Sequence, residues 1–158
     1  MRHVLIACTA LVLLAGCATT PEPVAAPATP AALPSVDTAG ARALLSRDET
    51  LQVLEFPRTG STTVQGRVVG ARATAHAVPV AAGQTLTVTF RPANPSLTMN
   101  IHDAKDGSGA ALHRGEIDGN TARITAATAT TYVIRPGLPR NSVRRGTAAN
   151  YSLTVARD

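Results

Sequence analysis

The segment TYVIRPGLPRNSVRRGTAANYSLTV (131–155) carries the two clearest strand patterns of the chain. At 132–135 and again at 151–155, large apolar residues occupy every second position. This alternation predicts two strands that each bury one face. They enclose a connection of about a dozen residues, whereas hairpin loops usually have about 2–5. Connections of this length tend to be functional or disordered, and we expect this one to be functional.

The charge of this loop is entirely positive. It contains arginines at 140, 144 and 145, with Arg135 at its base, and no acidic residue occurs between Asp118 and Asp158. Prolines and glycines in the same loop predict a pre-shaped backbone, which loses less entropy on binding. Arg140 and Arg144 are four residues apart, so they share one face in an extended segment or in one helical turn. The pair could enter one acidic pocket, or the arginines could only aid solubility.

Outward from this segment, the chain repeats the pattern of short strands. Alternating or apolar segments occur at 62–69, 74–80, 85–91, 97–101 and 121–125, separated by turns rich in Gly, Asp and Asn. With no Trp, two Phe and two Tyr, the core must consist mainly of aliphatic side chains. Many short strands with frequent turns favour a sandwich or barrel. We therefore predict one all-β domain at 47–158, a single antiparallel, jelly-roll-like β-sandwich.

The N-terminal residues 1–16 read as an export signal. Two basic residues precede an apolar run at 4–14, which is far shorter than the ~20 residues that span a bilayer. The run ends in Leu-Ala-Gly-Cys at 14–17, which resembles a bacterial lipoprotein lipobox. The resemblance implies cleavage before Cys17 and lipidation of that cysteine, and Ala18 favours the outer membrane, facing the periplasm. An ordinary signal peptide with a chance cysteine is the alternative.

Residues 17–46 are rich in Ala, Pro and Thr, a composition typical of an extended, disordered tether. A short helix is expected around 41–46. The other cysteine, Cys8, lies inside the export signal, so the sandwich itself has no thiol for a disulfide or a metal site.

Three segments carry a resemblance to a known family. They are LQVLEFPRTGSTTVQGRVVG (51–70), AAGQTLTV (81–88) and YVIRPGLPRNSVRRGTAANYSLTV (132–155). Their order is similar to that in the bacterial periplasmic inhibitors of g-type lysozyme, exported β-sandwich proteins related in style to pre-peptidase C-terminal domains. The last segment, where Arg-Asn is followed by a second Arg, resembles the inhibitory loop of that family.

The resemblance implies a partner and a set of contact residues. Arg140 and Arg144 would be the inhibitory residues in the last hairpin loop, Asn141 would shape the loop, and Arg145 would lie beside them. The partner would be a g-type lysozyme or a similar enzyme that cleaves peptidoglycan. At 71–74 the chain has Ala-Arg-Ala-Thr where the family has an aromatic contact. Arg72 would supply charge there as a possible second contact.

Other chemistry has little support in the sequence. His76, His102 and His113 show no HxH or HExxH spacing, so no metal is expected. The segment 103–107 looks like a calcium loop but has Lys105 where an oxygen ligand is required, which favours a plain turn.

Enzymatic activity and nucleic-acid binding are not expected either. Glu116 and Asp118 lie in a Gly-flanked turn and no nucleophile-elbow motif occurs, so we predict no catalysis and no cofactor. The chain has 15 Lys and Arg against 10 Asp and Glu, but its basic loop lacks interleaved aromatics, which disfavours nucleic acid. The alternative to a lysozyme inhibitor is an envelope structural or adhesive module that binds wall polymer or another envelope protein.

Overall fold

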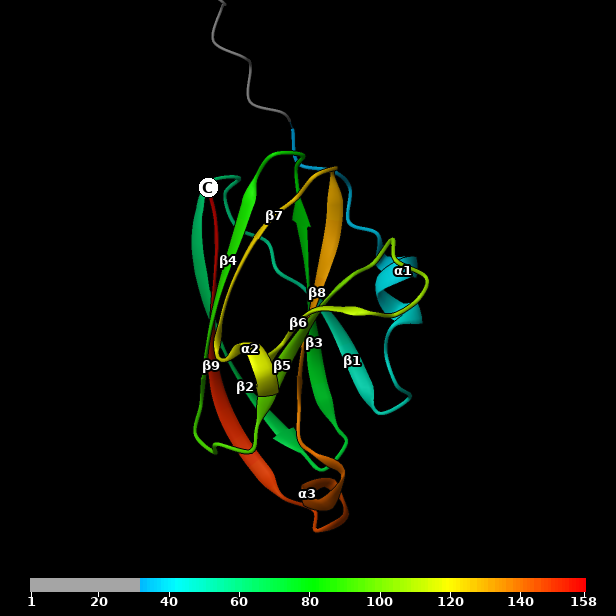
Figure 1. The fold of residues 1–158 in the computed structure, drawn as a ribbon, viewed down its shortest axis with the longest axis vertical. Coiled ribbons are helices and arrows are strands. Elements are labelled where there is room, and N and C mark those ends of the chain that lie inside the picture. Colours follow the sequence, from blue (N-terminus) through cyan, green and yellow to red (C-terminus); the bar gives the residue numbers. More distant parts are fainter. Residues whose placement is uncertain (1–31) are drawn as a thin grey trace, which may run out of the picture.

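Two β-sheets packed face to face form the domain (Figure 1). The computed structural model describes residues 32–158, so the predicted signal peptide and Cys17 lie outside the described residues. The first sheet has the strand order β1 (Glu49–Val53), β3 (Ala73–Val80), β8 (Thr130–Gly137), β5 (Thr98–Asp103) and β6 (Ala111–Arg114). The second has the order β2 (Gly60–Val69), β9 (Ala148–Arg157), β4 (Thr85–Pro92) and β7 (Thr121–Thr125).

The predicted all-β sandwich is confirmed, with one departure from a purely antiparallel arrangement. β1 pairs with β3 in parallel, and all other strand pairs of the described chain are antiparallel. Parallel neighbours need a crossover between them. Here β2 supplies it, because the chain passes through the second sheet between β1 and β3. Among residues 32–158, no helix is both long and apolar enough to cross a membrane.

The core between the sheets is aliphatic, as the composition requires. Along β4, the side chains of Leu86, Val88 and Phe90 are buried, while the threonines between them face outward. Tyr151 of β9 lies at the centre of the core, and its ring packs 5.2 Å from that of Phe90. Each fully buried side chain of this size contributes about 1.5–3 kcal/mol to folding. In β4, as in β9, the alternation in the sequence therefore determines which face of the strand points inward.

The folded domain begins earlier than residue 47. Helix α1 (Thr38–Ala43) starts at Asp37, whose side chain accepts a hydrogen bond from the Gly40 amide at 2.8 Å. Ala41 is fully buried against Ala77 and its neighbours on the outer face of the first sheet. The expected tether at 17–46 therefore differs from the structure over its last part, because the outer face of β3 and β8 is apolar and α1 covers it. The helix also starts and ends earlier than the expected 41–46.

The strands that flank the basic loop do not form a hairpin, contrary to the expectation from the sequence. β8 pairs with β3 and β5 in the first sheet, whereas β9 pairs with β2 and β4 in the second. The connection at 138–147 therefore crosses from one sheet to the other at the end of the sandwich. Inside it the chain forms a short helix, α3 (Arg140–Arg144). The unusual length of the connection follows from this crossing.

Candidate functional site

Helix α3 lies at the opposite end of the sandwich from the N-terminal end of the described chain (Figure 1). It begins after Pro139, whose carbonyl oxygen accepts hydrogen bonds from the amides of Ser142 and Val143 at 2.9 and 3.0 Å. It ends before Gly146, which has a φ of 64° that favours glycine. Ser142 is the buried residue of the turn, and its carbonyl oxygen accepts a hydrogen bond from the Thr147 amide at 3.0 Å. Pro139 and Gly146 therefore mark the two ends of the turn.

Arg140 and Arg144 are both exposed on this turn and lie four residues apart. Residues with this spacing share one face of a helix, with Cβ atoms about 5–6 Å apart. Among residues 32–158, no carboxylate lies within salt-bridge distance of Arg140, Arg144 or Arg145. Both guanidinium groups of the pair therefore keep their hydrogen-bond donors for another molecule.

Two further predicted site residues lie on the same turn and bond to Ser142. The Oδ1 atom of Asn141 accepts a hydrogen bond from the Ser142 amide at 2.7 Å. Arg145 donates from Nη2 to Ser142 Oγ at 3.3 Å. Asn141 and Arg145 are exposed, but part of their bonding capacity is used within α3.

The structure brings the turn that contains Arg72 next to the α3 connection. Val69 and Arg72 exchange two backbone hydrogen bonds of 3.0 Å, which close a tight turn between β2 and β3. Inside the turn, the Gly70 amide donates to the carbonyl oxygen of Thr147, just after α3, at 2.9 Å. The exposed Arg72 therefore belongs to the same end of the sandwich as the arginines of α3, although about 70 residues separate them in the sequence.

Arg135, at the base of the loop, is paired within the domain and is not available to a partner in the way that Arg140 and Arg144 are. Its guanidinium group forms a bidentate ion pair with Glu49, with Nη2–Oε2 and Nε–Oε1 distances of 2.6 and 3.1 Å. Burial opposes ionisation of Glu49, but its bonds with Arg135 and Ser46 outweigh burial and lower the pKa of the carboxyl group. The sequence pattern missed this pair because Glu49 comes from a strand far away in the chain.

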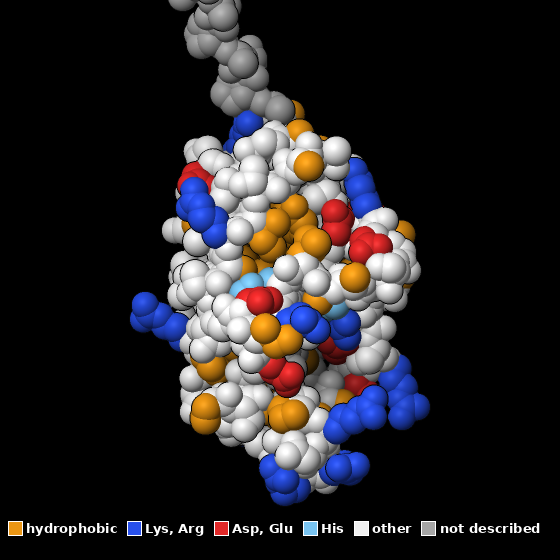
Figure 2. Space-filling view, viewed as in Figure 1, with side chains coloured by type: hydrophobic (Ala, Val, Ile, Leu, Met, Phe, Trp, Pro, Cys, Tyr) orange, Lys and Arg blue, Asp and Glu red, His pale blue; other side chains and the backbone are white. Residues whose placement is uncertain are grey.

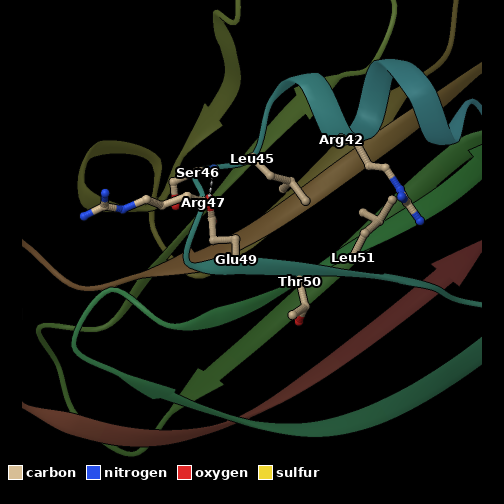
Figure 3. Close-up of a pocket in the computed structure, with 7 residues that line it drawn as sticks. All are labelled: Arg42, Leu45, Ser46, Arg47, Glu49, Thr50 and Leu51. Atoms are coloured by element: carbon tan, nitrogen blue, oxygen red, sulfur yellow. Dashed lines mark hydrogen bonds between the residues drawn. The ribbon is translucent and has the colours of Figure 1, made fainter.

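A groove lies between α1 and β1, but its charged groups do not converge. It has a volume of about 480 Å³ and contains Arg42, Arg47 and Glu49. Figure 3 shows Arg42 and Arg47 pointing in different directions. Glu49 turns back to the Ser46 amide, 2.7 Å away, and is already paired with Arg135. The groove therefore offers no cluster of free groups for chemistry.

The three histidines considered as metal ligands lie in separate places. His76 is 2% exposed, and its Nε2 atom lies 2.9 Å from the hydroxyl oxygen of Tyr151. His102 and His113 each contact a loop carbonyl oxygen through one ring nitrogen. Within residues 32–158, no three His, Cys, Asp or Glu side chains come together as candidate metal ligands.

The acidic side chains considered for calcium binding or catalysis do not converge on one site. Asp103 accepts hydrogen bonds from the Lys105 amide, at 3.0 Å, and from the Thr130 hydroxyl. Glu116 and Asp118 lie in α2 (Gly115–Asp118), and Asp118 accepts from the Arg114 amide at 2.8 Å. Asp103 and Asp118 therefore each accept a bond from an amide within their own turn.

A second groove, beside α3, was not predicted from the sequence. It has a volume of about 220 Å³ and is bordered by Ile117, Leu138 and Pro139. Ile117 is 66% exposed. The signal in the sequence is one isoleucine inside the polar turn RGEIDGN (114–120), where no strand or helix pattern requires it.

Comparison with known proteins shows the fold. No family model and no curated protein sequence matches the chain. Among solved structures, the chain is similar to Aeromonas hydrophila PliG, a periplasmic inhibitor of g-type lysozyme, with a TM-score of 0.61 and 23% identity over 70% of this chain and 98% of that one. An Escherichia coli PliG mutant gives 0.51 and 16%, with the same coverage.

A second kind of β-sandwich protein shares the architecture. The pre-peptidase C-terminal domain of a Bacillus anthracis collagenase gives a TM-score of 0.50 and 16% identity, over 70% of this chain and 97% of that domain. The predicted resemblance to these two groups of β-sandwich proteins is therefore confirmed at the level of the fold.

Proposed function

We propose that this protein is a lipid-anchored envelope inhibitor of g-type lysozyme and acts by placing Arg140 and Arg144 in the acidic catalytic cleft. The observation that carries the proposal is an exposed arginine pair without a carboxylate partner among the described residues, at one end of a sandwich. The PliG proteins, which share this fold over 98% of their length, are periplasmic inhibitors of g-type lysozyme.

The spacing of the pair suits the chemistry of glycan cleavage. Glycosidases typically use two carboxyl groups that lie about 5–9.5 Å apart. Two arginines on adjacent turns of one helix start from Cβ atoms about 5–6 Å apart, and their long side chains can reach either separation. The planar guanidinium group stays charged and can bind a carboxylate through two hydrogen bonds. Occupied carboxylates can neither protonate nor attack the glycan.

The fixed shape of α3 supports tight binding. Its backbone bonds and the buried Ser142 hold the turn in place before any partner arrives. A pre-organised loop loses less conformational entropy on binding than a flexible one. Central arginines often dominate the binding energy of an interface. Asn141, Arg145 and Arg72 lie around the pair and would make weaker contacts at its edge.

The position of the chain's N-terminal end fits an anchor at Cys17. In Figure 1 the described chain enters at the end of the sandwich opposite α3. An anchor on that side would leave α3 facing away from the membrane. About 20 residues separate Cys17 from α1, and a Pro-rich segment spans about 3.1 Å per residue when extended. The proposal therefore includes lipidation at Cys17. The lipid would anchor the protein to the outer membrane, with the domain in the periplasm.

An inhibition assay tests the proposal. The chain without its signal peptide, carrying Cys17→Ser, is added to g-type lysozyme acting on cell-wall substrate. We expect dose-dependent inhibition, which Arg140→Ala/Arg144→Ala reduces at least 100-fold while the domain stays folded by circular dichroism.

The matched control also removes two positive charges, but from positions away from α3. Arg42→Ala/Arg123→Ala replaces two exposed arginines outside the α3 end and should keep inhibition within about two-fold, since exposed charges away from an interface contribute little. Absence of inhibition by the unchanged domain against several g-type enzymes would overturn the proposal. It would favour an envelope module that binds wall polymer or another envelope protein.

A further inference from the structure

The groove beside α3 is built on the outer face of the first sheet. β5 lies between β6 and β8 in this sheet, and Asn100 of β5 is paired with Arg114 on one side and Arg135 on the other. Met99 and Ile101 point into the core, so Thr98 and Asn100 face outward and line the groove. Helix α2 forms one wall, and the link between β8 and α3 forms the opposite wall.

Ile117 is presented on the α2 wall by a turn that is firmly held. A Cβ atom at Gly115 would lie 2.6 Å from the Met99 carbonyl oxygen, which shows how closely the turn packs on β5. Asp118 closes the turn through its bond to the Arg114 amide, at 2.8 Å. Ile117 itself does not belong to the hydrophobic core clusters of the described chain. A held turn therefore exposes a branched apolar side chain that the fold does not use.

The groove is continuous with the basic end of the molecule. Pro139 lines the groove and is also the residue from which α3 begins, immediately before Arg140. In Figure 2, apolar side chains lie on this face between the positions of α2 and α3, with the basic side chains of the α3 end below them. A partner that reaches the arginine pair therefore comes within reach of Ile117.

The charged side chains of the groove largely compensate one another, and its apolar surface is confined to Ile117, Leu138 and Pro139 beside the polar Thr98 and Asn100. Of its charged side chains, Arg135 is paired with Glu49, which leaves one cation, Arg114, and one anion, Glu116. The groove lacks the uncompensated positive charge of α3. A carboxylate of the partner is attracted to the α3 end, whereas the groove suits an uncharged side chain.

Helix α3 is too small to form a stable protein interface alone, so a partner must also contact neighbouring surfaces. A stable protein interface usually involves about 20–30 residues on each side. Helix α3 has five residues. Its C-terminal end adjoins the turn that contains Gly70 and Arg72, and its N-terminal end adjoins the groove. These two neighbours are the surfaces that a partner seated on α3 would meet first.

We propose that the groove formed by Ile117, Leu138 and Pro139 is a second contact surface for the same partner, and that it receives an apolar side chain from the rim of the partner's acidic cleft. This inference rests on the proposed function. Interfaces of this kind combine an apolar centre with arginine and a polar rim. Specificity among g-type enzymes would then depend on the rim as well as on the catalytic carboxylates.

Ile117→Ser tests the inference, with Leu112→Ser as its matched control. Within residues 32–158, Leu112 is the other large exposed hydrophobic residue, at 52% against 66%, and it lies in β6 outside the groove. Burying an aliphatic side chain of this size contributes enough to change affinity at least ten-fold. We therefore expect the dissociation constant for g-type lysozyme to rise about ten-fold or more in Ile117→Ser and less than two-fold in Leu112→Ser. Ile117→Leu should bind nearly as well as the unchanged protein.

Salt separates this contact from the arginine pair. The loss caused by Ile117→Ser should be the same at low and high ionic strength, because an apolar contact is not screened. If Ile117→Ser binds like the unchanged protein while Arg140→Ala/Arg144→Ala loses binding, the groove inference is overturned and the proposed function stands. Equal losses in Ile117→Ser and Leu112→Ser also overturn it. If the unchanged protein does not bind g-type lysozyme, both the groove inference and the proposed function are overturned.

Discussion

Two regions of the molecule use arginine in opposite ways. Arg157 at the end of β9 is 2% exposed and donates from Nη1 to the Pro79 carbonyl oxygen at 2.6 Å and from Nη2 to that of Phe56 at 2.7 Å. Its guanidinium carbon also lies 3.9 Å from the centre of the Phe56 ring. Arg140 and Arg144 are exposed and have no carboxylate partner among the described residues.

The difference shows how to recognise an arginine that is available for binding. An arginine whose two terminal Nη groups donate to carbonyl oxygens inside the domain, as in Arg157, stabilises the fold. An exposed arginine without such bonds can bind a partner. Changes in the first group should lower stability without altering inhibition by the folded protein. Changes in the second should lower inhibition without altering stability.

The largest effect on stability is expected for Arg157→Met. The change keeps most of the side-chain volume but leaves three backbone carbonyl oxygens, those of Phe56, Pro57 and Pro79, without this donor. Each buried group left without a partner costs about 1–3 kcal/mol. We expect the free energy of unfolding to fall by at least about 3 kcal/mol, measured by urea denaturation. The exposed Arg123→Met should change it by less than about 0.5 kcal/mol, and equal effects of the two changes would contradict the comparison.

A somewhat smaller effect is expected from acid. Burial lowers the pKa of His76 to about 4, so the unfolded chain, with a value near 6.5, takes up the proton first. The stabilisation from neutral His76 is therefore present above pH 6.5 and is lost as the pH falls from 6.5 to 4. At about 1.4 kcal/mol per pKa unit, the full loss is at most roughly 3 kcal/mol.

The measurement is the free energy of unfolding of the unchanged protein and of His76→Gln between pH 7 and pH 4. Glutamine keeps a polar group near the Tyr151 hydroxyl but does not titrate. The unchanged protein should lose stability more steeply than the variant in this range. Parallel curves would show that His76 has no part in the pH dependence.

The smallest effect is expected for Arg145→Ala. Arg145 already donates to Ser142 Oγ and lies outside the pair formed by Arg140 and Arg144. Its contact with a partner would be at the edge of the interface, where exposed ion pairs contribute about 0–1 kcal/mol. Inhibition constants from the lysozyme assay should rise less than five-fold. A loss as large as that of Arg140→Ala would move the centre of the interface towards the C-terminal end of α3.

Much of the fold follows from the sequence because strand faces follow local alternation. The inward faces of β4, β5 and β9 could be assigned from the spacing of their apolar residues alone. The pairing of β8 and β9 with different sheets could not, because local alternation does not say which strand is the neighbour. The packing of α1 on the outer face of the first sheet was also not predicted. The residues that α1 covers there are mainly alanines, which give only a weak hydrophobic pattern in the sequence.

The candidate site divides in the same way. Arg140 and Arg144 stand out in the sequence because an all-basic loop with fixed spacing is a local feature. The pairing of Arg135 with Glu49 and the closeness of the Arg72 turn to α3 depend on contacts between distant segments. Ile117 is visible in the sequence only as an apolar residue in a polar turn, and its exposure becomes clear from the way α2 packs.

The central claim, that Arg140 and Arg144 bind the catalytic carboxylates, is tested most directly by a double-mutant cycle. Affinity is measured for the unchanged protein and Arg140→Ala/Arg144→Ala, each against a g-type lysozyme and against its variant with a catalytic carboxylic acid replaced by the corresponding amide. The account predicts strong coupling, because removing the arginines should cost far less once the carboxylate is neutral. Independent, additive losses would contradict it and place the arginines outside the catalytic cleft.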